Sequence, residues 1–598
     1  MDGRRDGNGP ALSLARHRLD PRRPYKPLDV GNGIVAGSLT AGGRWLELGI
    51  AHRVHGRVVV TDAPAFDPER RFDQPAVRRY RAALADPERP GFGLAALAGP
   101  ATAALLEASF PVAIHDRGGA RVEVVTFAPP GRHGAVQIVR AVMAGGGLDL
   151  GWTGTLRLGR AAYTQLTRGG PLPEVEERPL RGADGRTVWV VDETLGAAVA
   201  IAPPDPSAHT GTHVTAIALA DRLADAIREA NDLVRHGERL LEETVEARRT
   251  LWSGADLGPA QNVARRAVAY ALDCAASEAG EGSTAVLADH VILPLVWTRD
   301  AYYVCRALLA LAPREGAALA ARSLRWCFES AERPEGWWPR ASLATGGAKD
   351  HTFQLDQQLY PLLLLEDHAR HSGDDTLLRR YAADRDRVLD ALLARRTTYG
   401  LIATAETPAD DPIDAPYHFS SHVLLWRALR DVAPHTAEEV RRATLAHFVI
   451  RGRFAYAVGG PDGQGAHHYH DANDLPTVFA PGWGFCASDD PVWRATIEFA
   501  WSSGHAGYFA GRYAGLGSVH TPHPWPLGDL QELVVARVQG DRARAADAGA
   551  RLRRVAMWDE MLPEAYEERT GAVASRHWFA WPLLLWAFLD RDPTVIAP

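Results

Sequence analysis

The pattern of hydrophobic and polar residues divides the chain into two parts. Up to about residue 220, apolar residues alternate with polar ones in short runs that end at Gly, Pro or Asp. This alternation is typical of β-strands joined by turns. The runs begin with GRWLELGIAHRVHGRVVV and end with THVTAIALA. We therefore expect a β-sandwich of antiparallel strands over residues 1–220.

The period changes at Asp221. The segment ADRLADAIREANDLVRHGERLLEETVEARRTLW has apolar residues three and four positions apart, which predicts a long amphipathic helix. We expect residues 221–257 to form a helical linker between the two parts. Beyond Gly258 the same spacing predicts about a dozen helices within residues 258–598. The clearest cover residues 259–277, 299–311, 314–330, 353–371, 374–395, 416–432, 435–449, 490–503, 527–538, 541–556 and 575–589. Helices in this number, joined alternately by short and long loops, favour a toroid of paired helices.

Composition narrows the class of protein. The chain has 598 residues, 46% of them hydrophobic, and a formal charge of −7 with no basic run, so nucleic acid is not an expected partner. No stretch of 18 uncharged apolar residues predicts a membrane span, and the N-terminus lacks a signal-peptide core, so we expect a cytoplasmic protein. The four cysteines stand singly in apolar surroundings, which favours buried free thiols over disulfides or zinc ligands.

The long loops of the helical part concentrate Trp, Asp, Glu, Gly and His. Examples are VILPLVWTRD, RPEGWWPRASLATGGAKDHTFQLDQQ and LGSVHTPHPWPLGD. Sugars offer apolar ring faces for stacking and hydroxyl groups for bidentate hydrogen bonds. Loops of this composition at one rim of a helical ring therefore indicate a sugar-binding pocket.

Two segments supply polar groups at the start of helices. In VWTRD, Arg299 and Asp300 can grip adjacent hydroxyls of a terminal sugar beside Trp297, although Asp300 can also simply cap the helix and pair with its neighbour. In KDHTFQLDQQLYPLLLL the polar groups exceed what a helix N-terminus requires, so Asp356 is a candidate ligand for a hydroxyl.

The segment TAETPADDPIDAPYHFSS gathers Glu406, Asp410, Asp411 and Asp414 before a helix. A solvated acidic loop that caps the next helix is one interpretation. The other is chemical: two carboxylates crowded together near tryptophan raise one pKa, and that carboxyl can then protonate a leaving oxygen.

The run HHYHDAND, residues 467–474, holds three histidines and two aspartates. The histidines lack the i, i+4 spacing of a helical metal face, and no HExxH motif is present, so we expect no metal.

Glu564 stands between Pro563 and a polar turn that leads to the last, very apolar helix. Pro563 keeps the residue before it extended, which places the glutamate on a loop. An inverting glycosidase needs a carboxylate across the sugar from the acid, about 6.5–9.5 Å away, so that one water fits between them.

From about Trp297 to Leu589 the order of motifs resembles glycoside hydrolase family 125, the metal-independent exo-α-mannosidases. TAETPADDPIDAPYHFSS is similar to the family's Pro-Ser-Asp-Asp-Ala loop, and HDANDLPTVFAPGWGF is similar to its Asp-Asp-Ala-Asn-Val-Pro segment. LPEAYEERTGAVASRHWFAWPLLLW resembles its His-Glu-Ser-Phe segment followed by Thr-Arg-Pro-Trp-Phe-Ala-Trp. VWTRD and LPEAYEERTG also look like glucoamylases and the related trehalase and glucosidase families.

The resemblance implies an (α/α)6 barrel over residues 258–598 and hence a multidomain α+β protein. It implies Glu564 as general base and Asp410 or Asp411 as general acid, with Asp410 preferred. Residues expected to contact substrate are Trp297, Arg299, Asp300, Trp338, Asp356, Gln357, His470, Asp471, Asn473, Asp474, Trp483, His520, Arg576 and Trp578.

The expected function is an exo-acting inverting α-glycoside hydrolase that removes a terminal mannose-like or glucose-like sugar from an oligosaccharide or glycoconjugate without a cofactor. Two alternatives stay open. A sugar epimerase or isomerase on a similar toroid would use paired histidines for proton transfer, and a non-catalytic glycan-binding protein would keep the aromatic walls without needing both carboxylates. A phosphorylase would need an anion site, which no Gly-rich or basic loop supplies.

Overall fold

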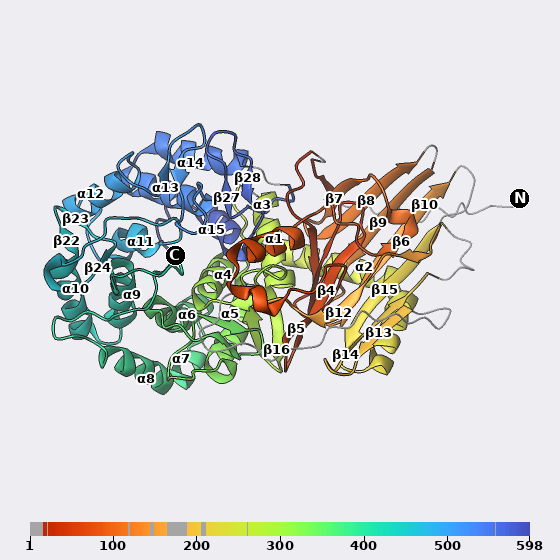
Figure 1. Cartoon of the computed structure of the whole chain (residues 1–598), viewed down its shortest axis with the longest axis horizontal. Helices are drawn as coiled ribbons and strands as arrows, with labels where there is room; N and C mark the ends of the chain where they lie inside the picture. The colour runs from red at the N-terminus through yellow and green to blue at the C-terminus, as the bar shows by residue number, and fades with distance from the viewer. Residues whose placement is uncertain are drawn as a thin grey trace, which may run out of the picture.

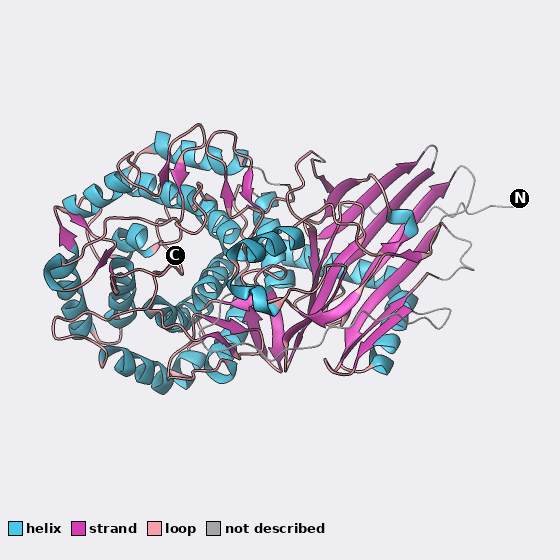
Figure 2. Cartoon of the chain, in the orientation of Figure 1, coloured by secondary structure: helices cyan, strands magenta, loops and turns pink. Residues whose placement is uncertain are grey.

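The computed structural model describes residues 16–20, 22–117, 120–143, 149–163, 188–204, 211–259, 261–555 and 558–598. Strands fill the N-terminal part and helices the C-terminal part, as Figures 1 and 2 show. The change in hydrophobic period near residue 220 thus coincides with the change in architecture.

Two antiparallel sheets make up most of the N-terminal part. The larger has the order β1 (Arg16–Arg18), β7 (Thr102–Leu106), β8 (Phe110–Arg117), β9 (Ala120–Phe127), β10 (Gly134–Met143), β15 (Thr212–Ala220), β14 (Ala197–Ala202) and β13 (Val188–Asp192). The smaller has the order β12 (Arg157–Arg160), β5 (Gly56–Thr61), β4 (Trp45–His52), β3 (Val35–Leu39) and β2 (Leu28–Gly31).

Successive side chains of a strand point to opposite faces, so the larger sheet contributes side chains to two different cores. Ile217 and Leu219 of β15 pack in the core shared with the smaller sheet. Ala216 and Ala218, between and beside them, pack instead against helix α2 (Leu223–Gly254). The two sheets therefore face each other across one core, which supports the expected sandwich, and α2 lies on the outer face of the larger sheet.

The C-terminal part is a ring of helices (Figure 2). Six of them contact one another in sequence and then close the circle, because the last contacts the first. They are α4 (Thr298–Leu311), α6 (Leu355–Ser372), α9 (Phe419–Arg430), α11 (Pro476–Trp483), α13 (Pro526–Gln539) and α15 (Ala580–Arg591). The remaining helices of this part are α3 (Gln261–Tyr270), α5 (Pro313–Arg325), α7 (Thr376–Arg380), α8 (Ala382–Leu393), α10 (Pro434–Phe448), α12 (Pro491–Ala500) and α14 (Arg542–Arg554).

The sequence explains which helices are central. Helix α15, AWPLLLWAFLDR, is apolar on every side and buried from Ala580 to Leu589. Helix α14, RARAADAGARLRR, buries only Ala548, Gly549 and Leu552, and it packs on α13. Central apolar helices with amphipathic partners support the (α/α)6 barrel expected for this part.

Short sheets connect the helices. Those of the helical part are formed by β16 (Ala276–Gly280), β17 (Ser283–Val286), β18 (Leu295–Val296), β19 (Ala341–Leu343), β20 (Ala348–Asp350), β21 (Tyr417–His418), β22 (Val449–Ile450), β23 (Arg453–Phe454), β24 (Ala457–Val458), β25 (Tyr508–Phe509), β26 (Gly515–Leu516), β27 (Ala565–Tyr566) and β28 (Val573–Ser575). A further pair, β6 (Gly93–Leu94) and β11 (Trp152–Thr153), lies in the N-terminal part.

The structure differs from the expected elements at several places. Residues 374–395 form two helices that break near Tyr381. The last helix begins at Ala580 instead of residue 575, because Ser575 belongs to β28, which pairs with β27, and residues 576–579 are not helical. Helix α11 was not among the clear expectations, since prolines interrupt its pattern. Helix α1 (Gln74–Leu84) lies in the part for which only strands were expected.

A buried ion cluster joins the two parts. Lys26 lies 2.6 Å from Asp29 and 2.7 Å from Asp559, and all three side chains have no exposed surface. Arg266 of α3 contacts the same two carboxylates at 2.5 and 2.7 Å. Two cations and two anions balance, which is the condition for keeping such charges in a dry interior.

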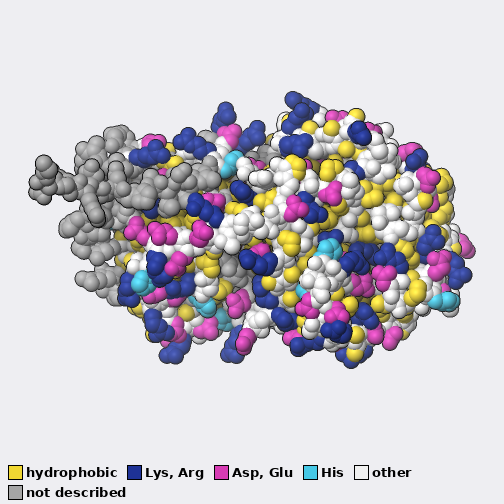
Figure 3. Space-filling view, turned by 180° about the vertical axis from the view of Figure 1, so that it is seen from behind, with side chains coloured by type: hydrophobic (Ala, Val, Ile, Leu, Met, Phe, Trp, Pro, Cys, Tyr) yellow, Lys and Arg dark blue, Asp and Glu magenta, His cyan; other side chains and the backbone are white. Residues whose placement is uncertain are grey.

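Among the described residues, no helix combines the length and apolar character that crossing a membrane requires. The four cysteines are buried and unpaired, as their surroundings in the sequence predicted. On the face shown in Figure 3, basic and acidic side chains are interspersed.

Candidate active site

A cavity of about 570 Å³ opens where the six central helices begin. The segment before each of these helices contributes to its wall, among them Trp297 before α4, Arg340 before α6 and Glu564 before α15. Its size lies within the range of about 300–1,000 Å³ that is usual for small-molecule sites. Helix N-termini carry partial positive charge, so this end of the ring favours the carboxylates gathered in it.

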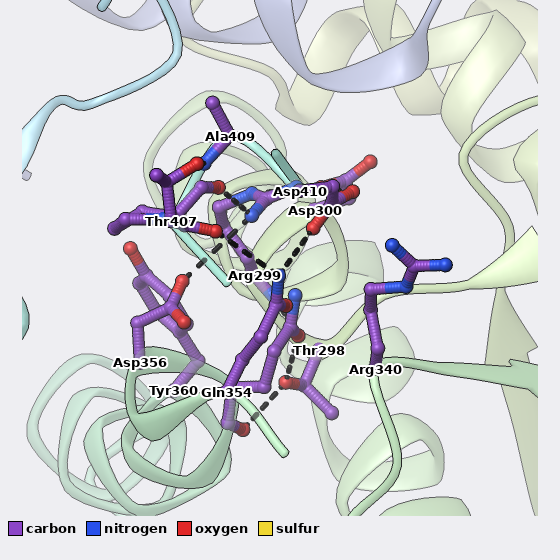
Figure 4. A network of polar contacts seen from close by, with 12 residues as sticks. Thr298, Arg299, Asp300, Arg340, Gln354, Asp356, Tyr360, Thr407, Ala409 and Asp410 are labelled. Carbon is purple, nitrogen blue, oxygen red and sulfur yellow. Dashed lines mark hydrogen bonds and ion pairs between the residues drawn. The ribbon is translucent and has the colours of Figure 1, made fainter. Parts of the chain in front are cut away.

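Arg299 is the centre of a buried charge network (Figure 4). It begins α4 with Asp300, because β18 pairs with β19 and directs the chain into the helix. Its guanidinium lies 3.4 Å from Asp300, 3.7 Å from Asp356 and 3.6 Å from Asp410. Gln357 fixes the helix start by accepting hydrogen bonds from the backbone of Arg299 at 3.1 Å and from the Thr298 hydroxyl at 2.6 Å.

One guanidinium cannot balance three carboxylates, of which those of Asp300 and Asp356 are buried and that of Asp410 is 21% exposed. Burial raises the pKa of Asp300 to about 6, although the charge of Arg299 works against that rise. Burial raises the pKa of Asp356 to about 7, again against the effect of Arg299. This network therefore holds a proton near neutral pH.

Asp410 adopts a left-handed backbone conformation, with φ at +67°. A non-glycine residue held there is uncommon and costs free energy unless its surroundings fix it. Gln354 provides such a restraint, since its amide donates to the Asp410 carboxylate at 2.7 Å and to the Thr407 carbonyl at 3.1 Å. The loop thus holds this carboxylate against the cavity with Arg299 behind it.

Asp411 faces a different partner. Its carboxylate lies 3.1 Å from Nδ1 of His520, which precedes α13. Burial would lower the pKa of His520, but Asp411, with smaller effects from Glu564 and Asp471, raises it to about 9. The two side chains therefore form an ion pair at neutral pH.

Glu564 is held at the cavity wall by the β27–β28 pair. Its backbone N–H donates to the His577 carbonyl at 2.6 Å, and its side chain is 9% exposed. Burial would raise the pKa of Glu564, but the nearby His577, with the charge of His520, lowers it to about 2. The carboxylate is therefore charged throughout the neutral range.

His577 links Glu564 to a second carboxylate. Its Nδ1 lies 3.7 Å from Glu564 and its Nε2 lies 2.8 Å from Asp289. Burial would lower the pKa of His577, but these two carboxylates raise it. Asp289 also accepts backbone N–H groups of residues 291–293, so it is itself fixed in place. The chain Asp289–His577–Glu564 keeps the imidazole oriented toward the cavity.

Arg340 forms a second cationic centre. It pairs with Asp350 of β20 and with Glu406 at 2.7 Å, and all three residues line the cavity. Burial would lower the pKa of Arg340, but nearby carboxylates raise it. This cation is thus engaged by carboxylates of its own wall.

Aromatic side chains complete the lining. Trp297, Trp525, Phe579 and Trp581 lie on the wall, the last stacked on Tyr303 with ring centroids 5.1 Å apart. Faces of this kind, beside fixed charged groups, suit the apolar face and hydroxyl edge of a sugar ring.

Helix α1 of the N-terminal part also reaches the cavity. Phe72, Gln74, Val77, Arg78 and Arg81 line it. Figure 1 shows α1 where the sheets meet the helical ring, in the region of α4 and α15. The site is therefore built from both parts of the chain.

The cavity brings together eight of the residues expected from the sequence. They are Trp297, Arg299, Asp300, Asp410, Asp411, Asn473, His520 and Glu564. Nine others do not line it: Trp338, Asp356, Gln357, His470, Asp471, Asp474, Trp483, Arg576 and Trp578. Asp356 and Gln357 lie directly behind Arg299, where they position it.

The tryptophans outside the cavity pack in the core. The indole N–H of Trp338 donates to the Cys327 carbonyl at 2.9 Å, and that of Trp578 donates to the Tyr270 hydroxyl at 2.9 Å. Trp483 donates to the Pro598 carbonyl at 3.2 Å. Each indole therefore has a structural hydrogen bond in place of a sugar contact.

Most of the HHYHDAND run also serves the interior. His470 is buried and bonds Gln531 at 2.6 Å, and Asp471 accepts from the Ser518 hydroxyl at 2.9 Å. Asp474 is buried as well, and that burial raises its pKa to about 8. Arg576 points outward and lies 3.4 Å from Asp86. In the part of the chain that the structure describes, no group of three or more His, Cys, Asp or Glu residues could hold a metal ion.

The residues that sequence reasoning missed include Arg340, Asp350, Trp525, His577, Phe579 and Trp581 as well as those from α1. The sequence could have predicted helix α1. Asp73 caps it by accepting a hydrogen bond from the Ala76 N–H, and a proline follows in the first turn. Its meeting with the helical ring joins segments more than two hundred residues apart, which no local pattern shows.

The chain has recognisable relatives. The family model for metal-independent α-mannosidases, glycoside hydrolase family 125, matches residues 378–588. The resemblance expected from the motifs is thus confirmed over a region that contains Asp410, Asp411 and Glu564. This match relates the helical part to glycoside hydrolases. No curated protein sequence matches the chain.

Solved structures extend the likeness. A bacterial glucoamylase complexed with acarbose is 13% identical with a TM-score of 0.62, and the match covers 98% of this chain and 96% of the glucoamylase. At this identity the likeness concerns the fold, which is shared over nearly the whole length. A metal-independent α-mannosidase of Streptococcus pneumoniae, in a non-productive complex with α-1,6-mannobiose, is 20% identical with a TM-score of 0.45, covering 60% of this chain and 98% of that one.

Proposed function

We propose that the protein is an exo-acting, inverting α-glycoside hydrolase that removes a terminal mannose-like or glucose-like sugar from an oligosaccharide or glycoconjugate. The observation that carries the proposal is the meeting of Glu564 with Asp410 and Asp411 in one cavity, although more than 150 residues separate them along the chain. Inverting hydrolysis needs two carboxyl groups in different protonation states on opposite sides of the scissile bond.

Glu564 is the proposed general base. A carboxylate whose pKa is about 2 stays ionised and can accept a proton from water at any pH at which the protein is folded. The hydroxyl of Thr521 lies 3.4 Å from Glu564 Oε2. A water bound to this carboxylate would therefore lie beside a second polar group. The activated water attacks the anomeric carbon and forms the new C–O bond.

Asp410 is the proposed general acid, with Asp411 as the alternative. Asp411 forms an ion pair with His520, an arrangement that suits a fixed negative charge better than a proton donor. Asp410 lines the cavity, where Gln354 orients its carboxyl group and Arg299 lies 3.6 Å behind it. In the proposed mechanism Asp410 delivers a proton to the glycosidic oxygen as the C–O bond breaks, which makes the leaving group neutral.

The remaining wall binds the terminal sugar. Arg299 and Asp300 are 4% and 5% exposed, so they mark the buried end of the cavity, where two adjacent sugar hydroxyls can be gripped. Trp297 and Trp581 offer ring faces beside them. No step of this mechanism needs a cofactor.

We further propose that the chain consists of a β-sandwich over residues 1–220, a helical linker over residues 221–257 and a closed (α/α)6 barrel over residues 258–598.

The epimerase alternative loses support from the site. His467, His468 and His470 do not line the cavity. His520 and His577 do, but carboxylates raise the pKa of both, and a protonated imidazole is a poor base.

The test measures turnover of the α-glycoside that the protein cleaves fastest in a screen of p-nitrophenyl α-glycosides and α-linked disaccharides. On an α-linked disaccharide, whose leaving group needs a proton, we expect Glu564→Gln and Asp410→Asn each to lower kcat by about 100-fold or more, since loss of a general acid or base usually has that effect. Asp414→Asn, a change in the same acidic loop at an exposed position outside the cavity, should leave kcat unchanged. Full turnover in both of the first two variants would remove the proposed roles.

A further inference from the structure

Helix α1 and the 3-10 turn before it, Pro68–Phe72, lie on the open side of the cavity. Phe72 is 59% exposed and Arg78 is exposed, yet both line the cavity. Arg299 and Asp300 also line the cavity but, by contrast, are only 4% and 5% exposed. In an enzyme that removes a terminal sugar, the sugar occupies the buried end and the leaving group extends toward the open end.

Two arginines of α1 face the cavity together. Arg78 and Arg81 stand three positions apart, so they share one face of the helix, where like charges repel each other. Their proximity also shows in the pKa of Arg81, which is lowered by burial and by the charge of Arg78, while Glu564 and Asp289 act in the opposite direction. The pair thus brings two cations to one wall, and carboxylates already act on Arg81.

Arg299 and Arg340, on other walls of the cavity, are also matched by carboxylates. Arg299 and Arg340 each contact at least two carboxylates of their own wall. Within the described part of the chain, Arg78 has no carboxylate within ion-pair distance. At Arg78 the α1 face thus carries a positive charge that no carboxylate of the described chain neutralises.

Phe72 supplies an apolar surface beside these charges. A phenylalanine so exposed at a cavity mouth offers its ring for stacking, and the guanidinium of Arg71 lies 4.8 Å from its centroid. The α1 face therefore combines a ring platform with two guanidinium groups, which bind carboxylate and phosphate oxygens well.

We propose that residues 72–81 form the leaving-group subsite and that Arg78 and Arg81 select glycosides whose leaving group carries a carboxylate or phosphate. The inference rests on the proposed function, because the cavity must hold a glycoside for a leaving group to lie there. The N-terminal part then takes a direct part in choosing the substrate.

The kinetic test uses three α-glycosides of the sugar that the protein accepts: 4-carboxyphenyl, 4-phosphonophenyl and the uncharged 4-carbamoylphenyl glycoside. The carboxyphenyl and carbamoylphenyl groups have nearly the same shape. A charge-assisted hydrogen bond is roughly twice as strong as a neutral one, so we expect kcat/KM to favour a charged glycoside by about 10-fold or more. The charged glycoside that gains more identifies the group the subsite takes.

Variants assign this preference to residues. Arg78→Gln and Arg81→Gln should bring the ratio of charged to uncharged kcat/KM toward one. Arg79→Gln makes the same change of charge on the same helix, but Arg79 is exposed and does not line the cavity, so the ratio should stay at its original value. A ratio below twofold in the original protein, or one unaffected by both variants, overturns the inference.

A binding measurement separates this inference from the proposed function. Calorimetry compares 4-hydroxybenzoate with 4-hydroxybenzamide, which correspond to the released leaving groups and need no hydrolysis. Tighter binding of the benzoate that is lost in Arg78→Gln supports the subsite even if no glycoside is cleaved, in which case only the proposed reaction fails. Cleavage of all three glycosides at equal kcat/KM, with equal binding of the two phenols, retains the reaction and removes the subsite.

Discussion

Replacement of His577 by glutamine should move the acid limb of the pH–activity profile to higher pH. In the folded protein the pKa of Glu564 falls from its usual 4.5 to about 2. That difference of 2.5 units corresponds to about 3 kcal/mol in favour of the carboxylate. Burial acts in the opposite direction, so His577 and the other polar neighbours more than offset it.

Glutamine removes the positive charge of His577 and leaves Glu564 buried. The pKa of Glu564 should then rise well above 2, because burial still raises it and the largest lowering contribution is gone. A general base works only when ionised, so activity is lost as the pH falls through its pKa. The profile of kcat/KM, which reports the free enzyme, should show no loss from Glu564 down to pH 4.5 in the original protein and a falling limb at higher pH in the variant.

The control is His523→Gln, because His523 is 39% exposed, pairs with Glu568 at 3.6 Å and does not line the cavity. Its profile should match that of the original protein. A His577→Gln protein whose kcat/KM falls equally at every pH, with the limb unmoved, would refute this reasoning and leave His577 a purely structural role.

Three further predictions concern the buried charges. Lys26→Met leaves the buried Asp29 and Asp559 to share Arg266, so the free energy of unfolding in urea should fall by about 3–5 kcal/mol. The surface change Arg23→Met should alter it by less than about 1 kcal/mol, and equal effects of the two variants would contradict the role of the cluster. Asp474 has a pKa raised to about 8 by burial, so the folded state holds a proton that the unfolded chain releases above about pH 4. The free energy of unfolding of Asp474→Asn, relative to that of the original protein, should therefore increase by about 1.4 kcal/mol per pH unit up to pH 8. A difference that does not change with pH would show that Asp474 is not protonated in the folded state. Asp410→Asn should slow cleavage of an α-linked disaccharide far more than that of a 2,4-dinitrophenyl glycoside, whose leaving group needs no proton; the same contrast in Asp411→Asn instead would move the acid to Asp411.

Most helices and strands followed from the sequence because the spacing of their buried residues matches the period of the element. The alternation in β15 and the all-round apolar character of α15 are local properties that survive in the folded chain. Helix α1 shows the limit of that reasoning. Its cap and proline predict a helix, yet its contact with the cavity depends on how two distant parts of the chain pack together.

Some of the expected site residues line the cavity and others pack in the core, for a related reason. Arg299, Asp300 and Glu564 stand where a loop meets a central helix, and the ring gathers all such places at one end. Trp338 and Trp578 have the same local surroundings, but their indole groups find hydrogen-bond partners in the core. A sequence shows that a tryptophan lies in a loop, whereas the direction of its side chain is decided by tertiary packing.

The central claim is that Glu564 directs a water to the face of the sugar opposite the leaving group. Proton NMR during the first minutes of hydrolysis identifies the anomer released from an α-glycoside before mutarotation mixes the forms. The account predicts that the β-anomer accumulates first. Initial release of the α-anomer would show retention of configuration and contradict the water-mediated mechanism.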